Sequence, residues 1–108
     1  MKLVVLGAGE SGVGTAILGK QKGYNVFVSD KGEIAKKYKK VLLNNEIPFE
    51  EGKHSENKIF EADVVMKSPG IPDKVAIIQE LIERKIPVIS EIEFASKYSK
   101  GIIVGITG

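Results

Sequence analysis

The glycines near the start of the chain have the spacing best suited to chemistry. Gly7, Gly9 and Gly12 form a GxGxxG pattern that follows an apolar run and opens a predicted helix. In such a loop the first glycine permits a tight turn, the second lets the backbone approach a diphosphate, and the third lets the helix pack closely on the strand. Free N–H groups at the helix start favour phosphate. The pattern predicts a nucleotide-binding loop, and a glycine turn that serves packing alone is the alternative.

Asp30 strengthens this prediction. It lies 18 residues after Gly12, at the predicted tip of the second strand, where an acidic side chain commonly meets a ribose. A helix cap or a solvent-facing acid is the alternative. Glu10, inside the glycine loop, repels a diphosphate unless its side chain turns to water, so its carboxylate is not expected to contact phosphate.

A second candidate group is Ser68-Pro69-Gly70-Ile71-Pro72, which follows the predicted fourth strand. Ligands of open parallel sheets lie outside the carboxyl ends of the strands, so this loop is expected on the same rim as Gly9 and Asp30. Its two prolines reduce the entropy lost on binding, and Gly70 has no side chain to block a flat ring. An ordinary strand-to-helix connection is the alternative.

The remaining candidate residues give weaker indications of function. Gly105-Ile106-Thr107-Gly108 ends the sequence, and it is either a simple turn or the opening of a phosphate loop. His54, the single histidine, lies in a polar segment and is predicted to be a surface side chain. Glu91 and Glu93 are two positions apart, so they do not share a helix face, which argues against a catalytic pair. No serine triad or metal-ligand spacing is present.

Alternating strands and helices must position these residues. Strands are predicted over residues 2–6, 25–30, 47–52, 63–66, 87–89 and 101–105, the third of them as an edge strand. Helices are predicted up to residue 21 and over 33–45, 73–85 and 91–98, with Asp73 as a cap and one helical turn within 53–61. This order predicts an α/β fold: a Rossmann-like parallel sheet of five to six strands with helices on both faces.

Length and composition exclude several classes of protein. A chain of 108 residues is one domain. Its net charge is +2 and Arg84 is its single arginine, so the arginine forks typical of nucleic-acid readers are missing. It has no cysteine, which excludes disulfides and thiolate sites and fits a reducing cytoplasm. No apolar run reaches membrane-spanning length. We therefore expect a cytoplasmic protein with neither nucleic acid nor membrane as partner.

Several segments, taken in order, resemble a known family. They are residues 7–14, Asp30, the 68–72 loop, Ile86-Pro87-Val88-Ile89-Ser90-Glu91-Ile92-Glu93, and residues 105–108. Together they resemble the N-terminal domain of the Mur ligases, in particular the members that join D-glutamate to UDP-N-acetylmuramoyl-L-alanine. The 68–72 loop followed by the Ile-Glu stretch is the specific part, because ordinary NAD domains lack it. The resemblance covers essentially the whole chain.

The resemblance implies a three-domain enzyme. Residues 1–108 would be the domain that binds UDP-N-acetylmuramoyl-L-alanine, truncated at the start of the ATP phosphate loop. The second domain would hold ATP and magnesium, and the third would help to bind D-glutamate. ATP phosphorylates the substrate carboxylate in this family, and the amine of D-glutamate attacks the acyl phosphate. This chain alone is then expected to be an inactive monomer without a cofactor.

The resemblance also implies the site residues by position. The UDP-binding residues are Gly9, Glu10, Ser11, Gly12, Asp30, Lys31, Ser68, Pro69 and Gly70, and the start of the ATP-binding loop is Gly105, Thr107 and Gly108. Asp30 matches the acid that accepts the uracil N3–H. Lys31 and Gly32 stand where some members have a hydroxyl and an arginine, so Lys31 would supply the positive charge.

Two other classes of protein share part of this pattern. An NAD-binding regulatory module, as in potassium-channel regulators, would use residues 7–12 and Asp30 in the same way. The 68–72 loop and the terminal Gly-Ile-Thr-Gly argue against it. A dehydrogenase is disfavoured because a catalytic histidine, a lysine–tyrosine pair and a second domain are lacking.

Overall fold

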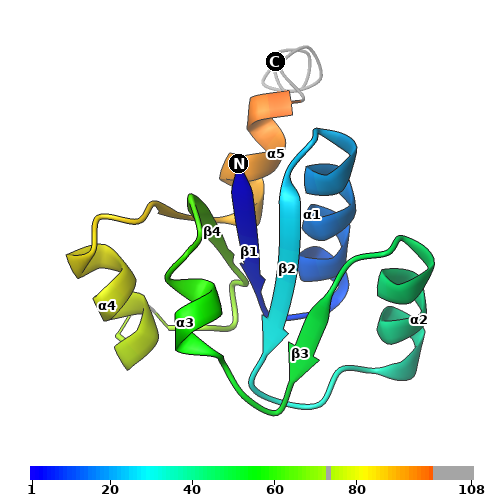
Figure 1. The fold of residues 1–108 in the computed structure, drawn as a ribbon, viewed down its shortest axis with the longest axis horizontal. Helices are drawn as coiled ribbons and strands as arrows, with labels where there is room; N and C mark the ends of the chain where they lie inside the picture. The colour runs from blue at the N-terminus through cyan, green and yellow to red at the C-terminus, as the bar shows by residue number, and fades with distance from the viewer. Residues whose placement is uncertain (73, 99–108) are drawn as a thin grey trace, which may run out of the picture.

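The computed structural model describes residues 1–72 and 74–98, and within them a single sheet of five parallel strands (Figure 1). The strands are β1 (Lys2–Leu6), β2 (Asn25–Asp30), β3 (Phe49–Glu51), β4 (Val64–Lys67) and β5 (Val88–Ile89), in the spatial order β3-β2-β1-β4-β5. The helices are α1 (Glu10–Gln21), α2 (Lys36–Asn44), α3 (Glu56–Ile59), α4 (Ala76–Glu83) and α5 (Glu91–Tyr98). The predicted α/β class and the edge position of the third strand are confirmed. The strand predicted over 101–105 lies outside the described residues.

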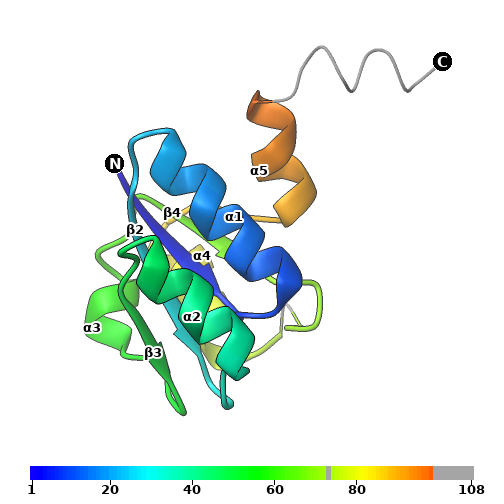
Figure 2. The same ribbon diagram turned by 90° about the vertical axis from the view of Figure 1, so that its right-hand side faces the viewer.

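Helices cover both faces of the sheet, as predicted. Residues 3–6 of the central strand β1 are wholly buried, and alternate side chains enter two different cores. Leu3 and Val5 pack with α1, α2 and α5, whereas Val4 and Leu6 pack with α3 and α4. Figure 2 shows α1 and α2 on the near side of the sheet and α4 behind it. A strand buried on both faces has no polar alternation, which is why β1 reads as a continuous apolar run.

Two helices begin later than the sequence predicts. α2 begins at Lys36 instead of residue 33, because Ile34 is buried and its N–H donates to the Glu51 carboxylate at 2.8 Å, which keeps the chain extended through Ala35. α4 begins at Ala76, and Val75 occupies its N-cap position with extended backbone. Asp73, the predicted cap, lies outside the described residues.

Three helices end in the same backbone motif. After α1, α2 and α4, the chain turns through a left-handed residue: Gly23 (φ 89°), Glu46 (φ 57°) and Lys85 (φ 62°). The residue after each turn donates its N–H back to a carbonyl in the last turn of the helix, for example Ile47 to the Leu42 carbonyl at 2.9 Å, as in a Schellman cap. Only glycine adopts this conformation without steric cost, so the caps after α2 and α4 carry strain that the cap after α1 does not.

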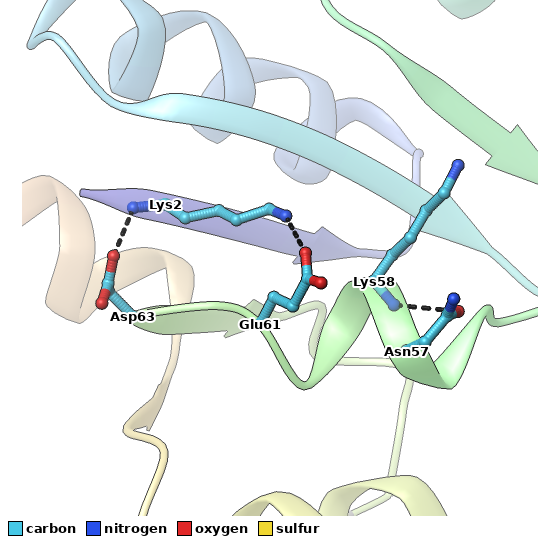
Figure 3. A network of polar contacts seen from close by, with 5 residues as sticks. All are labelled: Lys2, Asn57, Lys58, Glu61 and Asp63. Atoms are coloured by element: carbon cyan, nitrogen blue, oxygen red, sulfur yellow. Dashed lines mark hydrogen bonds and ion pairs between the residues drawn. The ribbon is translucent and has the colours of Figure 1, made fainter.

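Polar contacts occupy the amino ends of the strands (Figure 3). The Lys2 backbone N–H donates to Asp63 Oδ2 at 2.7 Å, and Lys2 Nζ pairs with Glu61 Oε1 at 2.9 Å. The hydrogen bond from Lys2 and its positive charge lower the pKa of the Glu61 carboxyl. Because all strands are parallel, this rim lies at the opposite end of the sheet from the predicted ligand loops.

No helix among the described residues is long and apolar enough to span a membrane.

Candidate functional site

The glycine loop (residues 7–12) joins β1 to α1 at the carboxyl end of the sheet. Gly7 has a φ of 98° and donates its N–H to the Ser29 carbonyl at 2.8 Å. A Cβ at Gly12 would lie 1.8 Å from the Gly7 carbonyl oxygen, so only glycine lets α1 approach the loop this closely. The tight turn and the close packing predicted for these two glycines are confirmed.

The start of α1 carries three further predicted residues. Gly9 is the N-cap; it is exposed, and a Cβ there would meet no atom within 4 Å. Glu10 is exposed and Ser11 is partly buried, both in the first turn. Among residues 1–72 and 74–98, no side chain caps this helix start. The first-turn N–H groups therefore remain open to a ligand.

Asp30 ties the tip of β2 to the glycine loop. Its Oδ2 accepts the Ala8 N–H at 2.8 Å, and its Oδ1 accepts the Gly32 N–H at 2.9 Å. Each carboxylate oxygen has a second lone pair, so the side chain retains acceptor capacity toward a ligand. Asp30 therefore has a structural role in addition to any role in binding.

The 68–72 loop lies beside the glycine loop, as predicted. Ser68 donates its N–H to the Leu6 carbonyl at 3.0 Å, and a Cβ at Gly7 would lie 2.6 Å from Ser68 Oγ. Within the loop, Ile71 donates its N–H to the Ser68 carbonyl at 3.0 Å, and Lys67 Nζ donates to the Ile71 carbonyl at 2.7 Å. These bonds hold the turn while Gly70 stays exposed.

A cavity of about 650 Å³ opens between these loops. It is lined by Gly7, Asp30, Lys31, Gly52, Lys53, His54, Glu56, Gly70, Ile71, Pro72, Val75, Ala76 and Ile77. Its size is typical of a small-molecule site. One wall is apolar and belongs to the start of α4 and the residues before it. The other wall is polar and comes from the ends of β2 and β3.

The cavity brings together only part of the predicted site. Of the predicted UDP-binding residues, Asp30, Lys31 and Gly70 line it. Gly9, Glu10, Ser11, Gly12, Ser68 and Pro69 do not line it, although they belong to the two loops that border it. Gly105, Thr107 and Gly108, predicted to begin an ATP loop, lie outside the described residues.

His54 is the main correction to the sequence-based prediction. It is a partly buried wall of the cavity, with Nδ1 at 2.7 Å from Ser29 Oγ, and not a free surface histidine. Burial lowers the pKa of His54, the negative charges of Asp30 and Glu50 oppose that effect, and Lys31 adds to it. A polar segment shows no periodic signal of burial. The sequence signal for a place of His54 in the site is its position directly after the third predicted strand, at the carboxyl end of the sheet.

Ser29, His54 and Glu50 form a network that has the residue types of a catalytic triad in the wrong order. Ser29 is fully buried and lies in the middle, with its Oγ 2.8 Å from Glu50 Oε2 and 2.7 Å from His54 Nδ1. A hydrolytic triad places the histidine between an accessible serine and the acid. The network is therefore a structural brace between β2 and the β3–α3 loop.

Glu50 anchors that brace as a carboxylate. Besides Ser29, it accepts the Ser55 N–H at 2.7 Å and the Ser55 hydroxyl at 2.5 Å. Burial by itself raises the pKa of Glu50, but the hydrogen bonds from Ser55 and Ser29 together with the Lys53 charge outweigh it and lower the pKa.

Glu93 belongs to a helix cap. Its N–H donates to Ser90 Oγ at 3.1 Å, and its Oε1 accepts the Ser90 N–H at 3.1 Å, which is a capping box at the start of α5. This agrees with the expectation that Glu91 and Glu93 are not a catalytic pair. Within the described residues, no cluster of three or more acidic or histidine side chains is arranged to hold a metal ion.

Comparison with known proteins identifies the family. The family model for the MurD N-terminal domain matches residues 2–77. The chain belongs to the MurD N-terminal domain family. It is 63% identical over 107 residues to the UDP-N-acetylmuramoylalanine--D-glutamate ligase of Christiangramia forsetii, covering 99% of this chain and 24% of that protein. It is 51% identical over 107 residues to the ligase of the same name from Bacteroides fragilis, again covering 99% and 24%.

Solved structures of other peptide ligases share the fold of this chain. A murein peptide ligase from Psychrobacter arcticus superposes with a TM-score of 0.80 at 20% identity, covering 91% of this chain and 20% of that chain. A pseudomurein peptide ligase type C from Methanothermus fervidus gives a TM-score of 0.74 at 28% identity, covering 90% and 20%. The chain spans about a quarter of the length of the curated relatives it matches (24% for both ligases above).

Proposed function

We propose that this chain binds UDP-N-acetylmuramoyl-L-alanine for an ATP-dependent ligase that joins D-glutamate to it in peptidoglycan synthesis. One observation carries the proposal: the rim cavity lies where Asp30, the glycine loop and the 68–72 loop converge. The names of the ligases that this chain resembles over almost its whole length support the choice of ligand.

The uracil is assigned to the cavity between Asp30 and Gly70. Gly70 is exposed and has no side chain, so a flat ring can lie against its backbone. Asp30 keeps lone pairs free while it accepts the Ala8 and Gly32 N–H groups, so it can also accept the uracil N3–H. Ile71 and Pro72 supply apolar surface beside the ring.

The diphosphate is assigned to the start of α1. Gly9 and the first-turn residues Glu10 and Ser11 offer uncapped backbone N–H groups at the positive end of the helix dipole. Glu10 is exposed, so its carboxylate can turn to water. Lys31 lines the cavity and adds a positive charge.

ATP, magnesium and D-glutamate are assigned to the remainder of the ligase, with residues 105–108 as the start of the ATP loop. We therefore propose that the 108-residue chain alone forms no amide bond. We also propose that it is monomeric and works in the cytoplasm.

Calorimetric titration tests the proposal. UDP-N-acetylmuramoyl-L-alanine and UDP are expected to bind the chain, and NAD is expected to give no signal at the same concentrations. The NAD-binding alternative predicts the reverse, and tight NAD binding without any response to the uridine compounds would refute the proposal.

A further inference from the structure

The β3–α3 loop forms the cavity wall that the proposed function leaves without a role. Gly52, Lys53 and His54 line the same cavity as Gly70, Ile71 and Pro72 of the 68–72 loop. The brace formed by Ser29 and Glu50 fixes the His54 ring in place, so this wall is preorganised.

The network assigns the proton on the His54 ring. The Ser29 hydroxyl has one proton and contacts two groups that can only accept, Glu50 Oε2 at 2.8 Å and the Lys53 carbonyl at 3.2 Å. Ser29 therefore donates to one of these, and toward His54 its oxygen can only accept. It follows that Nδ1 carries the hydrogen and that Nε2 of the neutral ring is an acceptor.

Nε2 is the ring nitrogen left for a ligand. Nδ1 is held by the fully buried Ser29, so Nε2 is the one nitrogen of this cavity-lining ring that Ser29 does not occupy. No residue of the described ranges 1–72 and 74–98 is hydrogen-bonded to Nε2. Asp30 lies close enough for its charge to act on His54, so the cavity offers two neighbouring acceptors.

We propose that His54 is a second ligand-binding acceptor, whose Nε2 accepts a hydrogen bond from a ribose hydroxyl of the uridine nucleotide. This inference rests on the proposed function. Uracil has one N–H donor, which the proposed function gives to Asp30. The donors that remain on uridine are the 2′ and 3′ hydroxyls of the ribose, so a second acceptor on the same wall suits the ribose.

The tautomer is tested first and needs no ligand. His54 is the only histidine, so its ring ¹⁵N signals need no assignment by mutation. At pH 8 the long-range ¹H–¹⁵N spectrum of the chain should show a protonated Nδ1 and a bare Nε2. A protonated Nε2 in the neutral ring would overturn the proposal, whatever binds.

Binding is tested with paired variants and paired ligands. His54→Asn keeps a donor near the Nδ1 position for Ser29 but lacks Nε2, whereas His54→Gln places an amide oxygen near the Nε2 position. We expect His54→Asn to weaken UDP-N-acetylmuramoyl-L-alanine about threefold to tenfold, the range of one neutral hydrogen bond. His54→Gln should recover part of that loss, and thermal unfolding checks that both variants fold.

Deoxy ligands locate the contact. One of the two analogues, 2′-deoxy or 3′-deoxy, should bind wild type more weakly than the parent ligand does. The same analogue should bind His54→Asn as tightly as the parent ligand binds that variant. An N3-methyluracil analogue should lose affinity for both proteins equally. If His54→Asn loses the same factor with every ligand, His54 only shapes the wall and the ribose contact is refuted. If wild type binds no uridine compound, the proposed function fails as well.

Discussion

At the scale of single residues, Asp30 and His54 show how one side chain can brace the fold and face the cavity. Asp30 accepts two backbone N–H groups, and His54 is held by a buried serine, yet both line the same opening. A substitution at either position therefore has a cost in stability and a cost in binding, and an experiment must separate the two.

For Asp30, replacement by alanine should weaken binding of UDP-N-acetylmuramoyl-L-alanine by about 1–3 kcal/mol, because the uracil N3–H loses its acceptor. The Ala8 N–H also loses its acceptor, and this loss should lower the free energy of unfolding. Asp63→Ala is the matched control. Asp63 also accepts a backbone N–H, from Lys2 at 2.7 Å, but at the opposite rim. It should lower the free energy of unfolding without changing the dissociation constant. Calorimetry and urea unfolding measure the two effects, and an unchanged affinity in Asp30→Ala would remove Asp30 from the site.

For His54, the lowered pKa makes stability depend on pH. In the unfolded chain the imidazole has the ordinary histidine pKa of 6.5, and in the folded chain the pKa of His54 lies below that value. Above pH 6.5 the imidazole is neutral in both the folded and the unfolded chain, so its protonation does not affect the free energy of unfolding. As the pH falls below 6.5, the unfolded chain binds the proton first, and the free energy of unfolding decreases. Urea unfolding at about pH 7.5 and about pH 5.5 should therefore show a larger loss for wild type than for His54→Gln. Equal losses would contradict a lowered pKa.

At the scale of elements, close packing at helix starts and strain at helix ends decide which substitutions the fold accepts. α1 approaches the glycine loop so closely that a methyl group at Gly12 would overlap a backbone oxygen. At the carboxyl ends of α2 and α4, the chain turns through Glu46 and Lys85, whose left-handed backbone conformation favours glycine.

Gly12→Ala should destabilise the chain by about 3 kcal/mol or more, because the obstructing atom, the Gly7 carbonyl oxygen at 1.8 Å, belongs to the backbone and cannot rotate away. Gly14 is the matched control in the same helix. A Cβ there meets nothing within 4 Å, so Gly14→Ala should stabilise the chain by about 0.5–1 kcal/mol. Urea unfolding compares them, and similar midpoints for both variants would contradict the packing described for α1.

Glu46→Gly and Lys85→Gly should each stabilise the chain by about 1 kcal/mol, since glycine relieves the left-handed backbone at φ 57° and 62°. Gly23→Ala is the converse control, with an expected loss of similar size at φ 89°. Thermal unfolding of the three variants gives the result. Destabilisation by both glycine substitutions would show that contacts of the Glu46 and Lys85 side chains outweigh the strain.

At the scale of the whole molecule, the described surface exposes its large apolar side chains at scattered positions. Its exposed large apolar side chains are Met1, Leu43, Ile82 and Ile92; Met1 precedes β1, and the other three lie on three different helices. Leu43 is on α2 and Ile82 is on α4, which cover opposite faces of the sheet. We therefore expect the 108-residue chain to sediment as a monomer of 11.7 kDa, with no increase in sedimentation coefficient at higher concentration. A dimer at micromolar concentration would contradict this expectation.

Local patterns were sufficient to predict most of the fold. The run 3–6 is buried on both faces, so its unbroken apolar character predicts a central parallel strand. The rule that ligands lie at carboxyl ends placed Asp30 and Gly70 on one rim, and both line the cavity. The start of α2 and the environment of His54 could not be predicted in this way. Both depend on contacts between residues 17 or 25 positions apart, Ile34 with Glu51 and Ser29 with His54, and no local pattern encodes them.

The ion pair of Lys2 with Glu61 has a practical consequence. It lies at the amino ends of the strands, and the cavity opens at their carboxyl ends. A handle attached at the amino terminus, beside Lys2, would therefore point away from the opening. The chain can be immobilised on a biosensor chip in one orientation, with its ligand rim facing the flow. Capture through Met1 should then preserve every uridine response that the chain shows in solution.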